Sequence, residues 1–287
     1  MHRWMVRLGF PLAILVGLEL SVGAVPQAAS PAADLVDQAV VQLQQGQPVQ
    51  AEALLNQAIR QLGQQGDPQL EAAAQFLLGR TYLEMERYQE ALTVHQQALN
   101  LAANLNNPLL RGAILTSTAQ TYALLGQYAQ AINTYQQALQ LARQLKDRAW
   151  EGTLLNNLGF IYKETNQLNE ALRYFQQGLA IGRALGDLDQ VGTCLNCIGL
   201  AYMGLGNYTE ALDYYQQALA QARSRNNLTD QVGILSNIGA TQRALNNLPA
   251  ALTAFAQALR LAEQLGDSEQ AQVLRNEIIL LRRDLPG

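Results

Sequence analysis

A short motif recurs along this chain at an interval of 40 residues, and no other feature restricts the possible folds as strongly. From Ala91 onward, each copy has alanine, then leucine or isoleucine, an aromatic residue or histidine, and a small residue followed by leucine. The first alanine of the series recurs at Ala51, Ala91, Ala131, Ala171, Ala211 and Ala251. An internal repeat of this length is typical of a solenoid of stacked helical units, in which each unit packs only against its neighbours.

Glycine and asparagine residues between the motifs predict where helices end. In a pair such as Gly66-Asp67, the first residue tolerates the left-handed backbone that ends a helix, and the second can cap the next helix. The equivalent pairs are Asn106-Asn107, Lys146-Asp147, Gly186-Asp187, Asn226-Asn227 and Gly266-Asp267. Half a period away lies a second set of stops, at Gly46, Glu86, Gly126, Asn166, Gly206 and Asn246. We expect glycine and asparagine to supply the left-handed residues, with Lys146 and Glu86 departing from that pattern.

Each period therefore contains two helices, which we call helix A and helix B. In one unit the stops predict helix A over about 148–165 and helix B over about 168–185. Leu155, Leu158, Gly159 and Tyr162 share one face of helix A because they follow helical spacing. A small residue at the position of Gly159 recurs in each period, and we expect it to admit the aromatic side chain of helix B, such as Phe175.

The repeats divide most of the chain into units and leave distinct segments at both ends. We expect six units, at 32–67, 68–107, 108–147, 148–187, 188–227 and 228–267. A last helix at 268–285 repeats helix A without a helix B after it, and Ile279 stands there in place of the small residue. We interpret this helix as a cap whose polar outer face stops the stack.

The N-terminal stretch has the features of a secretory leader. Arg3 and Arg7 precede a short apolar run, and small residues follow up to Ala24. We expect a signal peptide at 1–24, a linker at 25–31 and an exported product, either periplasmic or secreted. The alternative is an uncleaved membrane anchor, although the apolar run is short for a span of about 20 residues.

The combined pattern resembles the tetratricopeptide repeat. Leu158, Gly159, Tyr162, Ala171 and Phe175 match positions of that motif, and the following unit repeats them with Ile198 in place of Leu158. The period of 40 exceeds the usual 34 and is similar to the long repeats of kinesin light chains and of Leu-Gly-Asn-type adaptors. The resemblance implies an all-α fold, a right-handed α-solenoid of antiparallel helix pairs with a C-terminal capping helix.

The same resemblance implies that helices A line a concave groove that binds a protein segment. The sequence Leu155-Asn156-Asn157-Leu158 is similar to a kinesin light chain motif whose asparagines hold the backbone of an extended peptide. We expect Asn157 and Asn237 to form one row in the groove, and Asn156 and Asn196 a second. The alternative is that these amides are simply solvated. The expected peptide-binding residues are Arg80, Asn156, Asn157, Phe160, Lys163, Asn196, Leu200, Met203, Asn237 and Arg243.

Other chemistry finds little support in the residue pattern. Cys194 and Cys197 form an isolated CxxC inside an expected helix A, and with His2 and His95 as the only histidines a zinc site lacks ligands. We expect structural cysteines, a packed His95, no metal or small-molecule cofactor, and no catalytic site. The net charge of −4 argues against a nucleic-acid partner, and membrane association would require an uncleaved leader.

The sequence thus favours an exported scaffold or adaptor that binds an extended peptide or protein segment. One alternative is a structural protein that self-associates through the ends of its solenoid. Another is a separate regulatory subunit of an enzyme carried on another chain.

Overall fold

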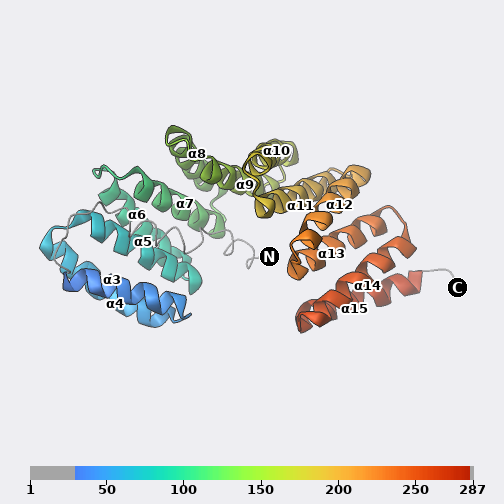
Figure 1. The fold of residues 1–287 in the computed structure, drawn as a ribbon, viewed down its shortest axis with the longest axis horizontal. Coiled ribbons are helices and arrows are strands. Elements are labelled where there is room, and N and C mark those ends of the chain that lie inside the picture. Colours follow the sequence, from blue (N-terminus) through green and yellow to red (C-terminus); the bar gives the residue numbers. More distant parts are fainter. Residues whose placement is uncertain (1–29, 285–287) are drawn as a thin grey trace. The chain divides into compact units, whose positions relative to one another are not determined.

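The computed structural model describes residues 30–284, which form thirteen α-helices and no strand (Figure 1). The expected leader at 1–24 and most of the expected linker lie outside the described residues. The described residues divide between Lys146 and Asp147 into two compact units, which we call unit 1 and unit 2. Unit 1 contains α3 Pro31–Gln44, α4 Pro48–Gln65, α5 Pro68–Glu84, α6 Tyr88–Ala102, α7 Pro108–Leu124 and α8 Tyr128–Gln144. Unit 2 contains α9 Arg148–Glu164, α10 Leu168–Leu185, α11 Leu188–Gly204, α12 Tyr208–Ser224, α13 Leu228–Ala244, α14 Leu248–Gln264 and α15 Ser268–Asp284.

Within each unit, helices that are consecutive in the chain pack against one another as antiparallel pairs. Odd-numbered helices from α3 to α15 are helices A, and even-numbered helices from α4 to α14 are helices B. Successive helices A also touch, as α9 does with α11 and α11 with α13. The all-α solenoid of helix pairs is confirmed. The bounds of α9 and α10 lie within one residue of the ranges expected from the stops.

Side-chain caps begin the helices A where the sequence places an aspartate or asparagine. The Oδ1 atom of each capping residue accepts a hydrogen bond from the backbone N–H three residues later, at 2.9–3.0 Å. This bond satisfies one of the amides that a helix leaves unpaired in its first turn. The capping residues are Asp67, Asn107, Asp147, Asp187, Asn227 and Asp267.

The ends of helices follow backbone geometry more strictly than residue type. Lys146 and Glu86 adopt φ of 57° and 59°, so the left-handed stop occurs there without glycine or asparagine. Asn106 has no positive φ, and the expectation for that residue is wrong. The physical reason is that α6 ends early, at Ala102. The N–H groups after its end turn back to carbonyls three residues away, as Leu105 does to Ala102 at 3.3 Å, and the chain has left the helix before Asn106.

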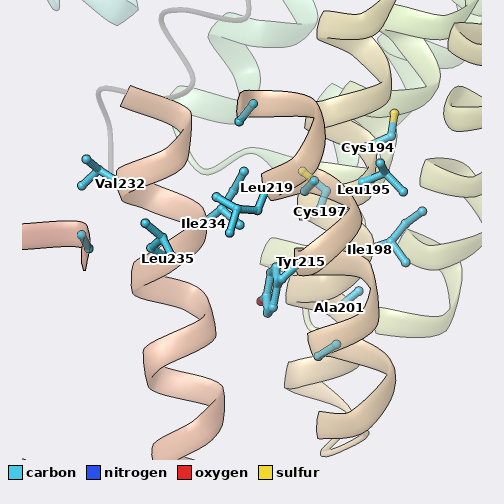
Figure 2. Close-up of a cluster of buried hydrophobic side chains, with 14 of the residues drawn as sticks. Cys194, Leu195, Cys197, Ile198, Ala201, Tyr215, Leu219, Val232, Ile234 and Leu235 are labelled. Carbon is cyan, nitrogen blue, oxygen red and sulfur yellow. The ribbon is translucent and has the colours of Figure 1, made fainter. Parts of the chain in front are cut away.

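Close approach of helices A and B explains the recurrent small residue. A Cβ atom at Gly159 would lie 2.5 Å from the Phe175 ring, and one at Gly199 would lie 2.6 Å from Tyr215. The expected pairing of a small residue with an aromatic side chain is therefore confirmed. In unit 2 these aromatic rings join a continuous buried core, part of which comes from α11, α12 and α13 (Figure 2). Unit 1 has a second buried core of its own.

The capping helix α15 differs from the expectation in one respect. Its inner face buries Ala271, Leu274, Ile278 and Leu281. Its remaining surface exposes Val273 by 56% and both Ile279 and Leu280 by 50%, so the expectation of a polar outer face is wrong in part. None of the helices in residues 30–284 combines the length and the apolar character that a bilayer span requires.

Candidate ligand-binding face of helices A

Three successive helices A of unit 2 carry nine of the ten candidate binding residues. These helices are α9, α11 and α13, and direct contact between neighbours places their side chains in one layer. We call this surface the helix-A face. The tenth candidate, Arg80, lies on α5 in unit 1. The nine residues of unit 2 are Asn156, Asn157, Phe160 and Lys163 on α9, Asn196, Leu200 and Met203 on α11, and Asn237 and Arg243 on α13.

Two candidate asparagines bond to each other across neighbouring helices. Nδ2 of Asn237 donates to Oδ1 of Asn196 at 3.0 Å, and both side chains are half-buried. Within the described part of the chain, no other hydrogen bond engages Nδ2 of Asn196 or Oδ1 of Asn237. The pair therefore retains one unused donor group and one unused acceptor, which is the complement of a backbone peptide group.

The other two asparagines are more deeply placed. Asn156 and Asn157 are each only 5% exposed. Oδ1 of Asn156 lies 3.7 Å from Sγ of Cys194 on the neighbouring helix A, and accepts from that thiol. The structure thus joins Asn196 to Asn237 and places Asn156 against α11, whereas the spacing alone had grouped Asn157 with Asn237 and Asn156 with Asn196. Little of either α9 amide is available to a ligand.

Three apolar candidates lie on α9 and α11 without being fully covered. Phe160, Leu200 and Met203 are half-buried and pack against the core of unit 2. The Phe160 ring meets Phe175 edge to face, with centroids 5.6 Å apart. The hydroxyl of Tyr215 points at Sδ of Met203 from 3.8 Å, which helps to fix the thioether. These side chains offer partly exposed apolar surface held in place from beneath.

Charged candidates already have partners on the protein. Lys163 forms an ion pair with Glu164, and Arg243 forms one with Glu277 of α15. In unit 1, burial lowers the pKa of Arg80 from its ordinary value, and the Coulombic attraction of Glu84 acts in the opposite direction. Burial likewise raises the pKa of Glu84, opposed by Arg80. The face therefore presents no isolated cluster of one charge on these residues.

The two cysteines are buried in the core of unit 2 (Figure 2). Burial raises the pKa of the Cys194 thiol to about 12, and burial also raises the pKa of Cys197. Both side chains are therefore protonated thiols at neutral pH and poor nucleophiles. Among residues 30–284, no three side chains of histidine, cysteine, aspartate or glutamate gather as metal ligands would.

His95 is packed rather than catalytic. It occupies the aromatic slot of α6 with no exposed surface, and its pKa falls to about 3, mainly because of burial. Nδ1 lies 3.2 Å from Oγ1 of Thr121, whose own hydrogen goes to the Ser117 carbonyl, so Nδ1 donates to Thr121. An imidazole that no solvent reaches and that binds a proton this weakly is poorly suited to act as a general base for a bound substrate.

Stacked tyrosine pairs were not foreseen from the sequence. Tyr162 of α9 stacks on Tyr174 of α10 with centroids 5.1 Å apart, and Tyr202 stacks on Tyr214 at 5.5 Å in the next helix pair. The signal was present, because each pair joins residues 12 positions apart and recurs after 40. Tyr162 was expected on the face of helix A, whereas Tyr174 had been given no role. Each stack joins a ring of helix A to a ring of helix B within one pair.

Comparisons with known proteins agree with this architecture. The family model for the tetratricopeptide repeat matches residues 32–104, 111–184 and 190–282. No curated protein sequence matches the chain significantly.

Among solved structures, the apo form of RapI is similar with a TM-score of 0.71 at 14% identity, covering 88% of this chain and 98% of that one. Kinesin light chain-like repeats of Podosopora anserina are similar with a TM-score of 0.60 at 22% identity, covering 68% of this chain and 96% of that one. A Rap protein complexed with Competence and Sporulation Factor is similar with a TM-score of 0.61 at 15% identity, covering 95% of this chain and 80% of that one. At these identities the likeness concerns the fold.

Proposed function

Because this chain belongs to the tetratricopeptide repeat family, we propose that it is an exported scaffold whose helix-A face binds an extended segment of another protein. The paired amides of Asn196 and Asn237 carry the proposal. Their unused donor and acceptor match the C=O and N–H groups of one peptide unit. An extended segment has such groups unpaired, so this contact would recognise backbone rather than a particular side chain.

Apolar side chains beside the amide pair would supply most of the binding energy. Leu200 lies four residues beyond Asn196 on α11, and Met203 lies one further turn along. When a ligand covers half-buried side chains of this type, their remaining exposed surface is removed from water. Each Å² of apolar area buried in this way contributes about 25 cal/mol of favourable free energy. Their anchoring within the core also means that little order must be gained on binding.

The similar fold of the Rap protein in complex with Competence and Sporulation Factor supports this reading. That solenoid was crystallised in complex with the factor that its fold holds. We assign the present chain a protein or peptide segment as its ligand and no catalytic activity of its own. The regulatory-subunit alternative is a special case, in which the bound protein is an enzyme.

Binding of a peptide selected from a random library provides the test. The double replacement of Asn196 and Asn237 by alanine should weaken that binding by about 1–3 kcal/mol, because each lost amide leaves peptide groups unpaired. The matched control replaces Gln176 and Gln216, exposed amides on helices B, by alanine. The control should keep the parent affinity, as measured by calorimetric titration with helicity checked by circular dichroism. Equal losses in the two variants, or no loss in the asparagine variant, would show that the helix-A face is not the binding surface.

Export is the second part of the proposal and rests on the leader-like sequence at 1–24. Its test is the intact mass of the protein recovered from the exported fraction. The expected mature chain begins at Val25. Recovery of residues 1–24 on protein held in the membrane pellet would contradict cleavage.

A further inference from the structure

The outer surface of α15 departs from the pattern of the other helices A in unit 2. Among the helices A of unit 2, α9, α11 and α13 are each covered by the helix B that follows them, whereas no described helix follows α15. Ile279 occupies the position of Gly159, Gly199 and Gly239, which in their units lie beneath an aromatic ring. Here the isoleucine is 50% exposed.

The outer surface combines apolar side chains with a charge at each end. Residues spaced by seven lie on nearly the same side of an α-helix, since it has 3.6 residues per turn. Glu269, Asn276 and Arg283 form such a line opposite the buried residues of α15, and all three are exposed. Gln272, Val273, Ile279 and Leu280 flank the line. We call these seven residues the α15 face.

The α15 face is symmetric about its centre. Asn276 is the midpoint, and an antiparallel copy of the helix placed on that midpoint would bring the acidic end against the basic end. Within residues 30–284, neither Glu269 nor Arg283 forms an ion pair that would compete with this contact. The resulting cross-pairs are Glu269 with Arg283, Gln272 with Leu280, Val273 with Ile279, and Asn276 with itself.

We propose that the α15 face is a homodimer interface, on which α15 of a second copy packs antiparallel about a twofold axis at Asn276. A twofold contact is self-complementary, so every pair occurs twice. The two ion pairs lie at the ends of the interface, and Val273, Ile279 and Leu280 of both copies fill its centre. Oδ1 of Asn276 accepts a hydrogen bond from Nε2 of Gln272 on the same helix at 3.1 Å, and its second lone pair and its Nδ2 group can still exchange hydrogen bonds with Asn276 of the second copy at the axis.

Two other occupants fit the face less well. A helix B of the repeat type would direct an aromatic ring at Ile279, where each of α9, α11 and α13 has a glycine. The first described helix of another copy, α3, would offer Val41 as its exposed large apolar side chain, beside Asp34 and Asp37. Packed parallel, α3 would place its two aspartates toward Glu269, and packed antiparallel it would offer Glu269 no cation, because α3 has no lysine or arginine. Either contact would also leave a free end on each copy and continue into filaments instead of closing as a dimer.

The expected dimer is weak. A helix of 17 residues is about 25 Å long, and one crossing pair of such helices buries less than the roughly 1,200 Å² typical of stable complexes. We therefore expect dissociation in the micromolar range, and the full chain should be examined by sedimentation velocity from about 1 to 300 μM. It should move from monomer to dimer over that range, without larger species.

Charge reversal tests the register of the contact. Glu269→Arg or Arg283→Glu alone places like charges opposite each other at both ends and should weaken the dimer about tenfold or more. The double variant with both changes restores both pairs and should dimerise as the parent does. An equimolar mixture of the two single variants should form heterodimers for the same reason. Because all these residues are exposed, the helical content of each variant should equal that of the parent.

Two further variants separate the apolar contact from other sites. Leu280→Glu should abolish the dimer, whereas Val41→Glu on α3 should leave it intact. A monomer at all concentrations overturns the proposal, as do species larger than a dimer or loss of the dimer in the Val41 variant. Failure of the charge-reversed mixture to recover the dimer overturns it as well. The peptide titration described above does not depend on these results, so the two proposals fail independently.

Discussion

A fall in pH from 7.5 to 5 should destabilise unit 1 through one buried imidazole, that of His95. Burial lowers the pKa of this side chain from 6.5 to about 3, and the nearby charge of Arg80 contributes in the same direction. Between these two values the unfolded chain binds a proton that the folded chain does not. Stability is therefore fully retained above the unfolded pKa, declines as pH falls through 6.5, and levels off only below the folded pKa.

The size of the effect follows from the two pKa values. One pKa unit corresponds to 1.36 kcal/mol, so at pH 5 the free energy of unfolding should be lower by about 2 kcal/mol on account of His95. The side chain has no exposed surface, so solvent screening does not reduce this figure. Other groups also titrate in this range, and a variant without the imidazole is needed to isolate the contribution.

His95→Phe provides that variant. Phe175 and Phe255 fill the equivalent slot in unit 2 opposite a glycine, and Gly79 stands opposite His95. Thr121 keeps its bond to the Ser117 carbonyl when the imidazole is removed. Urea denaturation followed by circular dichroism measures the free energy of unfolding at pH 7.5 and at pH 5. Its decrease between the two pH values should be smaller by about 2 kcal/mol in the variant than in the parent. If parent and variant lose the same stability, His95 is not the neutral buried group described here.

Three further predictions concern packing, backbone and thiols. Ala171→Leu should lower the free energy of unfolding by about 1–3 kcal/mol through overpacking of the fully buried contact between α9 and α10, and an unchanged melting temperature would refute the close approach. Lys146→Gly should raise stability by up to about 1 kcal/mol, because glycine adopts the observed φ of 57° without strain; a loss in thermal denaturation would contradict this. Cys194 and Cys197 should resist iodoacetamide at pH 8 in the native state and react once urea unfolds the chain, as followed by mass spectrometry; rapid native labelling would show that the thiols are accessible.

Local chemistry determined most of the fold from the sequence by itself. Caps such as Asp187, stops such as Gly186 and helical spacing act over a few residues, so the bounds of α9 and α10 could be predicted closely. The pairing of Gly159 with Phe175 was also predictable, because each unit repeats it. Even here a local exception escaped prediction: α6 ends at Ala102, although Asn106 has the residue type of a stop.

The candidate site depended on how neighbouring helices A pack, which only the tertiary structure decided. A period of 40 places Asn156 and Asn196 at equivalent positions, yet Asn196 bonds to Asn237 while Asn156 is 5% exposed against Cys194. Spacing specifies which side of its own helix a residue occupies. Whether that side is open, shared with the next helix or buried depends on the distance and rotation between helices, which arise from the volumes of all the side chains between them. The exposed α15 face has the same origin, since an apolar residue is interior or exterior according to what packs over it.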